Sequence, residues 1–214
     1  MPAKITVGDT FVYRYLDGFG NLPPSQVTYR VNEVSGERVI MSVTPETPET
    51  PREGYARAEV YASNGNWLRH VVRSHNYPLD REFVSPYPAF DFPLVPGKSW
   101  STRIDTIDPA SKQQGESMVV KGKVIGAERV RVPAGEFDTI KVQRHVFIDH
   151  VSGFLNTAGN THITETDWYA PALGRVVRSE NQSDWHVSGK SPAFSQEYGD
   201  WHVYELISGP SSSR

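Results

Sequence analysis

An alternation of apolar and polar residues with a period of two runs through almost every patterned segment of this 214-residue chain. It begins at residues 10–16, where Phe11, Tyr13 and Tyr15 share one side, and it continues through residues 26–43. No run with the period of a helix extends beyond about two turns. Because a period of two places successive side chains on opposite faces of a strand, the chain is predicted to be all-β.

Turns that contain glycine or proline separate the predicted strands. Asn64-Gly65 is a strong hairpin signal, because both residues tolerate a positive φ, and Ser35-Gly36 marks another hairpin. Pro133-Ala134-Gly135 and the Pro-Ala-Leu-Gly run at residues 171–174 provide later reversals. We therefore expect a strongly curved antiparallel sheet, or an open β-barrel or sandwich.

Two stretches about a hundred residues apart in the chain resemble each other and indicate an internal duplication. Residues 61–74 and 168–179 both read as strand, tight turn and strand, and both end in Val-Val-Arg-Ser. Residues 97–100 likewise repeat the small, polar and aromatic order of residues 8–11. We predict a single domain over residues 1–214. Its parts are two related halves at about 8–74 and 97–179, a C-terminal hairpin over 180–207, and a disordered tail over 208–214.

The segment between the two predicted halves, residues 75–96, is rich in proline and aromatic residues. So long an irregular connection is unusual in a compact domain. Its apolar side chains, among them Tyr87 and Phe90, indicate that it packs onto other parts of the chain. The segment is therefore predicted to be an irregular strap that covers part of the sheet.

Composition narrows the classes of function. The chain has no cysteine, which removes thiol catalysis and cysteine-based zinc sites. The net charge is −3 and the basic residues are scattered, whereas a nucleic-acid interface needs them clustered on one face. No apolar run approaches the roughly 18 residues of a membrane-spanning helix. We expect no nucleic-acid partner, no transmembrane segment and no cofactor.

Candidate catalytic and metal-binding residues are few. His145 and Asp149 share a strand face but stand about 13 Å apart along it, so one ion would need a ligand from another strand, such as His162. Glu165 and Asp167 share a face and are interpreted as exposed strand charges. No Gly-x-Ser-x-Gly motif is present. A hydrolase or metal-dependent enzyme is the third alternative, and no catalytic or metal-binding residue is predicted.

Arg144 interrupts an otherwise apolar strand face formed by Ile140, Val142, Val146 and Ile148. A buried arginine must find an anion or several hydrogen-bond acceptors. One interpretation is an intramolecular partner such as Glu165. The other is a cavity with aromatic walls in which Arg144 holds the anionic head group of a ligand.

Two turn motifs carry a resemblance to a known group of proteins. Residues 132–139 contain Pro-Ala-Gly-x-Phe before a strand, and residues 168–176 contain Trp-Tyr-x-Pro-x-x-Gly. This combination resembles uncharacterised bacterial envelope proteins, many of them predicted lipoproteins, which look like relatives of the curved sheets of lipoprotein carriers. The resemblance implies residence in the bacterial periplasm or cell envelope, with the cytoplasm as the alternative. It brings no catalytic residues, and this chain departs from it in having no lipidation cysteine.

These observations favour a non-enzymatic envelope protein that binds an apolar or amphipathic small molecule, or an envelope protein partner, in the concavity of its sheet. The residues predicted to line the concavity are Trp100, Arg144, Trp168 and Tyr169. The competing hypothesis is a structural or protein-interaction module whose concave face is filled by its own side chains.

Overall fold

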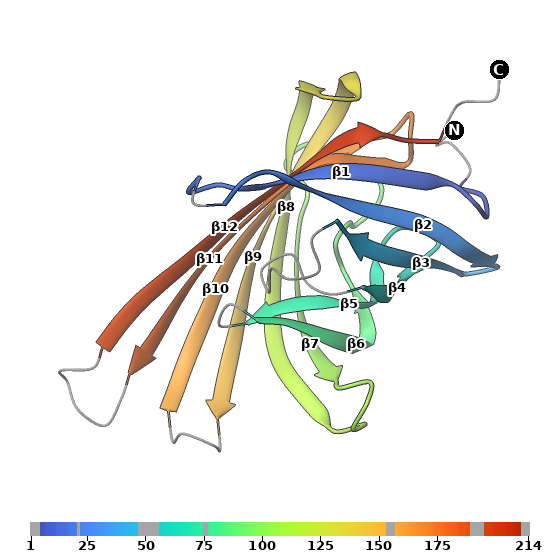
Figure 1. Ribbon diagram of the computed structural model, residues 1–214. Helices are drawn as coiled ribbons and strands as arrows, with labels where there is room; N and C mark the ends of the chain where they lie inside the picture. Colours follow the sequence, from blue (N-terminus) through green and yellow to red (C-terminus); the bar gives the residue numbers. More distant parts are fainter. Residues whose placement is uncertain are drawn as a thin grey trace.

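In the computed structural model, twelve antiparallel strands close into one barrel (Figure 1). The structure describes residues 5–20, 22–46, 56–74, 77–152, 157–188 and 195–210. Each strand pairs with its neighbours in the chain, and β1 pairs with β12. The strands are β1 (Thr10–Asp17), β2 (Ser25–Ser35), β3 (Arg38–Pro45), β4 (Arg57–Ala62), β5 (Trp67–Ser74), β6 (Tyr77–Tyr87), β7 (Ser99–Ile107), β8 (Gln114–Val132), β9 (Gly135–Ser152), β10 (Thr157–Ala170), β11 (Arg175–Ser188) and β12 (Ser195–Ser208).

The barrel confirms the all-β antiparallel fold class and sharpens it, because the sheet closes fully between β1 and β12 where an open edge was one expectation. Closure pairs β1 with β12, the two strands that would otherwise be the edges of the sheet. Among the described residues, no helix is long and apolar enough to cross a membrane.

The turns lie where the sequence predicts them. Gly36, Gly65 and Gly174 have φ angles of 48°, 84° and 62°, which other residues rarely adopt. Between the turns, burial alternates along the strands: in β1, for example, Phe11, Tyr13 and Tyr15 face inward and are buried, whereas Val12 and Arg14 are partly exposed. Local pattern therefore determines both the hairpins and the inner face.

The predicted strap over residues 75–96 is shorter than expected, since residues 77–87 form β6. Two residues of this segment, His75 and Asn76, lie outside the described residues. Prolines such as Pro86 fit this strand because β6 pairs with β7 only at Glu82 and Phe83, which leaves most of that side without ladder bonds. Residues 88–98, which connect β6 to β7, are irregular; we call them the inner loop. The tail is also shorter than predicted, because Ser208 ends β12.

The inner loop folds into the barrel and is held there by side chains from three strands or turns. The Asn66 side chain bonds the Phe90 backbone twice, accepting from its N–H at 2.8 Å and donating to its carbonyl at 3.0 Å. Trp100 donates its indole N–H to the Pro88 carbonyl at 3.1 Å. Arg144 donates to the Ala89 carbonyl at 2.9 Å. The first part of the loop, with Ala89 and Phe90 buried, thus lies in the barrel interior, whereas Phe92 and Val95 are exposed.

The internal duplication stays a prediction. An up-and-down barrel repeats the same hairpin unit around its axis, so similar hairpins arise in it whether or not the gene was duplicated.

Candidate functional site

A cavity of about 740 Å³ occupies the interior of the barrel. Twelve strands form a wider barrel than the eight whose interior side chains just fill, so space is left over. Because successive turns alternate between the two ends, the turns at residues 36–37, 63–66 and 171–174 gather at one end, which we call the mouth. Val34 and Phe92 line the cavity and are 39% and 41% exposed, so it reaches solvent there.

Most of the cavity wall is aromatic or aliphatic. The aromatic wall residues include Tyr13, Tyr29, Tyr61, Trp67, Phe83, Tyr87, Phe90, Phe92, Tyr169 and Tyr204, and the aliphatic ones include Val39, Met41, Val72, Met118, Val146, Ile148 and Ile163. Trp67 is stacked between His70 and Tyr87, with ring centroids 4.1 and 4.3 Å away. Such a wall suits a ligand with a large apolar surface.

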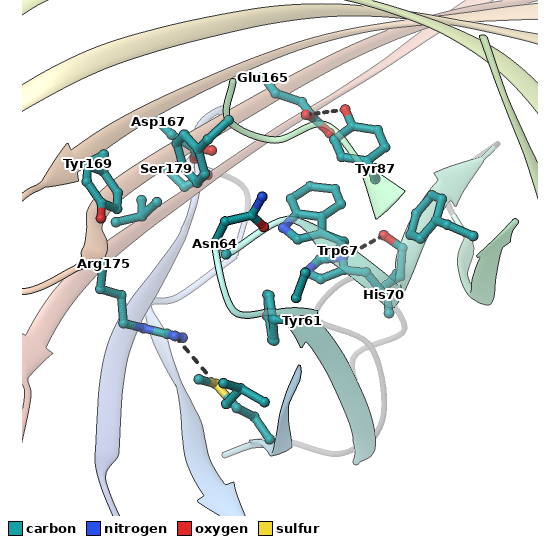
Figure 2. A pocket seen from close by; sticks show the side chains of 18 of the residues that line it. Tyr61, Asn64, Trp67, His70, Tyr87, Glu165, Asp167, Tyr169, Arg175 and Ser179 are labelled. Atoms are coloured by element: carbon teal, nitrogen blue, oxygen red, sulfur yellow. Dashed lines mark hydrogen bonds between the residues drawn. The ribbon is translucent and has the colours of Figure 1, made fainter. Parts of the chain in front are cut away.

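A buried charge cluster lies on the β9 and β10 wall of the cavity. Arg144 donates to Glu165 at 2.7 Å and to Asp167 at 2.6 Å. The Tyr87 hydroxyl donates to Glu165 at 2.7 Å (Figure 2). Burial disfavours the charged guanidinium, but Asp167 and Glu165 outweigh it and hold the pKa of Arg144 well above its usual value. The third nitrogen of Arg144 donates to the Ala89 carbonyl of the inner loop, so each of the three nitrogens has a partner within the chain.

The intramolecular partner that one interpretation of Arg144 predicts is present, because Glu165 stands directly opposite Arg144 across the β9–β10 pair and forms an ion pair with it. The interpretation of Glu165 and Asp167 as exposed charges is wrong. They do share a face, but they are only 8% and 5% exposed. That face is the interior, where a carboxylate needs the charge and hydrogen bonds that Arg144 supplies.

A second buried cluster lies on β4 and β5 around Glu59. Its carboxylate accepts hydrogen bonds from Arg57, at 2.8 Å to the Nε atom, and from the Tyr61 hydroxyl. His70 Nε2 lies 3.2 Å from the same carboxylate. Burial raises the pKa of Glu59, but His70 and Arg57 outweigh it and lower the pKa overall. The cluster is satisfied within the chain.

Stability is expected to depend on pH through His70. Burial lowers the pKa of His70, although Glu59 acts in the opposite direction. An unfolded histidine titrates near pH 6.5, so as the pH falls through about 6.5 the unfolded chain gains this proton before the folded one, and stability falls. The variant His70→Gln lacks this contribution and should lose less stability than the wild type between pH 7 and 5.5.

Urea denaturation at the two pH values measures this difference. His145→Gln is the control for loss of an imidazole, since His145 is exposed on the outer face. Equal losses of unfolding free energy in the wild type and His70→Gln would show that folding does not lower the pKa of His70.

A third cationic group, Arg175, enters the cavity at the mouth. It begins β11, directly after the turn at residues 171–174. Its Nε donates to the Tyr13 hydroxyl at 3.0 Å, and its Nη1 lies 3.4 Å from the Met41 sulfur (Figure 2). Its guanidinium carbon lies 4.3 Å from the centre of the Phe11 ring.

The four residues predicted to line the concavity fall into two groups. Arg144 and Tyr169 line the cavity, and Tyr169 packs against Phe90 at 5.1 Å between ring centroids. Trp168 stands between the inward residues Asp167 and Tyr169, so it points to the other face, where Lys141 and Arg178 lie over its ring at 4.7 and 5.1 Å.

Trp100 also lies away from the cavity wall. It faces inward but rests on Gly122, where a Cβ atom would come within 2.1 Å of its ring, and it holds the inner loop through Pro88. Trp100 and Trp168 therefore fill and support the structure. Whether Arg144 and Tyr169 contact a ligand stays a prediction.

The sequence analysis missed Tyr61, Trp67, His70 and Arg175 as cavity residues. A signal was present for β4, because Arg57, Glu59 and Tyr61 are spaced by two and must share a face. Arg175 carries no such signal, since its inward position depends on the turn before it.

The histidines considered as metal ligands lie on the outer face. His145 Nδ1 is 3.2 Å from the Thr164 hydroxyl, and the His162 ring packs against Phe147 at 5.0 Å. The side chain of Asp149 lies outside the described residues. In the part of the chain that the structure describes, no group of three or more histidine, aspartate or glutamate side chains could hold a metal ion.

Fold and site together define an up-and-down β-barrel with an aromatic internal cavity. The chain was compared with family models, with curated proteins and with solved structures. A family model described as DUF3108-like matches residues 96–187. A candidate lipoprotein of Parabacteroides distasonis is similar in structure, with 18% identity, a TM-score of 0.55 and 95% of each chain covered. A candidate exported protein of Bacteroides fragilis with a YmcC-like fold has 18% identity and a TM-score of 0.54, with 96% of this chain and 97% of that one covered.

No curated protein matches the chain. At this level of identity the two solved structures show the fold. The predicted resemblance to lipoprotein-like β-proteins is confirmed to that extent, while the two turn motifs remain untested.

Proposed function

We propose that this chain is a non-enzymatic protein of the bacterial envelope that binds an apolar or amphipathic small molecule inside its barrel. The observation that carries the proposal is the cavity: about 740 Å³, open to solvent and lined mainly by aromatic and aliphatic side chains. Ligand sites of proteins typically have volumes of about 300–1,000 Å³ and mostly apolar walls. A module with a filled core, the competing hypothesis, has no need for such a space.

The polar groups of the cavity support binding over catalysis. Glu165 and Asp167 are both held by Arg144, and Glu59 is held by Arg57 and Tyr61. Carboxylates fixed in this way on one wall do not form a pair across a substrate, as hydrolysis of a glycoside requires. Burial of apolar surface is therefore the main source of ligand affinity in this proposal.

Support for the envelope comes from the structural relatives, one described as a lipoprotein candidate and the other as an exported protein candidate. An envelope protein with an internal cavity would shield an apolar molecule from water on its way through an aqueous compartment.

Titration with straight-chain alcohols, from octanol to tetradecanol, tests the proposal on delipidated protein. Each added methylene buried in the cavity should improve the affinity by about 0.8 kcal/mol, or about fourfold, until the cavity is full. Trp67 lies in the wall, so its fluorescence should report binding. Absence of saturable binding along the whole series would falsify the proposal.

Two substitutions by tryptophan test whether the hydrocarbon chains of the alcohols bind inside the barrel. Ile163→Trp adds volume inside the cavity and should lower the chain length at which the affinity stops rising. Phe147→Trp adds a ring on the outer face, where Phe147 is exposed, and should leave that chain length unchanged. Equal behaviour of the two variants would place the binding outside the barrel.

A further inference from the structure

Arg175 differs from the other two arginines of the cavity in its partners. Arg57 is paired with Glu59, and Arg144 with Glu165 and Asp167. Arg175 has no carboxylate within ion-pair distance among the described residues; its hydrogen bonds go to a tyrosine hydroxyl and to a methionine sulfur. It is a cavity cation without a counter-anion in the described part of the chain.

The guanidinium of Arg175 is fixed in place before any ligand arrives. Its carbon lies over three rings, with distances to their centres of 4.3 Å for Phe11, 5.3 Å for Tyr29 and 5.8 Å for Tyr13. The Tyr13 hydroxyl donates its proton to the Val176 carbonyl at 2.7 Å, so its oxygen is turned to accept from Arg175. An arginine held by stacking loses little further freedom when it binds an anion.

Several N–H groups of Arg175 remain available. A guanidinium has five N–H donors. One donates to Tyr13, and one contacts the Met41 sulfur, which is a weak acceptor. The remaining donors have no partner in the described residues and face an aromatic surrounding, where an unpaired charge is costly.

We infer that Arg175 binds the anionic, oxygen-bearing head group of an amphipathic ligand, such as a carboxylate, while the ligand's hydrocarbon chain extends into the deeper cavity. The inference deepens the proposed function and rests on it. The planar guanidinium matches a carboxylate through two parallel hydrogen bonds. The cation then gains the counter-charge that it lacks.

The position of Arg175 gives the ligand a direction. Arg175 pairs with Ala170 at the mouth end of β10, and Tyr169 and Ile163 farther along this strand both line the cavity. These two residues are about 20 Å apart along the strand, at roughly 3.3 Å per residue. Met118 and Ile148 lie on the wall of the deeper part. The head group therefore lies near the mouth and the chain points inward.

Arg144 is unsuited to this role. All three of its nitrogens donate within the chain, to Glu165, Asp167 and the Ala89 carbonyl. A ligand anion at Arg144 would also face the two carboxylates that already hold it.

Calorimetric titration with dodecanoate and with dodecanol separates the head group from the chain. The wild type is expected to bind dodecanoate between about tenfold and a hundredfold more tightly than dodecanol, as a hydrogen bond to a charged group implies. Arg175→Gln should abolish this preference, because the affinity for dodecanoate falls by more than the affinity for dodecanol. Arg175→Lys should retain part of it, since the charge remains and the paired geometry is lost.

Arg129→Gln is the matched control, because Arg129 is exposed, pairs with the exposed Asp138 and does not line the cavity, so the same charge is removed outside it. It should behave as the wild type. Circular dichroism checks the fold of each variant. If Arg175→Gln does not fold, the ratio of the dodecanoate and dodecanol affinities in the wild type and in Arg175→Lys tests the inference.

Equal affinity of the wild type for both ligands, or an unchanged preference for dodecanoate in Arg175→Gln, overturns the inference about Arg175 and leaves the proposed function standing. Binding of neither ligand overturns the proposed function with it.

Discussion

Replacing Arg144 by methionine is expected to lower the free energy of unfolding by about 3–5 kcal/mol, because it leaves a buried pair of carboxylates without a counter-charge. Glu165 and Asp167 would face each other's charge in an interior where only Tyr87 still donates a hydrogen bond to Glu165. The Ala89 carbonyl in the inner loop would also lose its donor. Methionine has a similar length, so the effect reports the lost charge more than lost volume.

Urea denaturation at pH 7 measures the loss. Arg129→Met is the matched control: it breaks an exposed ion pair, which contributes at most about 1 kcal/mol. Neutralising both carboxylates, with Glu165→Gln and Asp167→Asn, should restore part of the stability of Arg144→Met, since the charges that need compensation are then gone. A loss below about 1 kcal/mol in Arg144→Met would mean that the cluster is not buried as described.

Asn66→Ala is expected to cost about 2–4 kcal/mol and to loosen the inner loop. The Asn66 side chain satisfies both the N–H and the carbonyl of Phe90, and Asn66 and Phe90 are buried. Removing one partner of a buried hydrogen bond leaves the other group unsatisfied at a cost of about 1–3 kcal/mol. Here a donor and an acceptor are left unsatisfied together.

Two measurements separate the overall loss from the local one. Urea denaturation gives the loss of unfolding free energy, and limited proteolysis with mass spectrometry should show faster cleavage within residues 88–98. Asn64→Ala is the control: the Asn64 side-chain oxygen accepts one hydrogen bond in the same turn, from the Asn66 N–H, and its loss should cost about 1 kcal/mol. Unchanged cleavage of Asn66→Ala within the loop would show that Asn66 does not hold it.

The strands and turns could be predicted from sequence because both depend on neighbouring residues. The period of two and the glycines at positions 36, 65 and 174 act within one hairpin. Closure of the barrel depends instead on the pairing of β1 with β12, which lie at opposite ends of the chain. No local sequence pattern indicates that contact, so the sequence fits an open sheet as well as a closed barrel.

The cavity residues were harder to predict, because the interior is partly polar. In β4, the apolar residues Ala58 and Val60 alternate with Arg57, Glu59 and Tyr61, and it is these last three that form the interior cluster. The rule that apolar residues face inward gives the opposite orientation. It fails here because the inward charges compensate one another, and His70, which joins them, comes from a different strand.

Arg144 was more accessible to prediction than Arg175. An arginine in an apolar strand face indicates a buried partner. Glu165 lies directly across from Arg144 on β10, the next strand in the chain. The neighbours of Arg175 come from β1 and β3, which are distant in sequence. Only the folded chain shows that they surround it without a carboxylate.

Because β1 pairs with β12, the first and last strands of the chain lie side by side in the barrel wall. β1 starts and β12 ends at the end of the barrel where the cavity opens (Figure 1). Ile5, before β1, even contributes to the cavity wall. The chain therefore enters the barrel before β1 and leaves it after β12 on the side of the entrance, so both of these connections lie beside the route into the cavity.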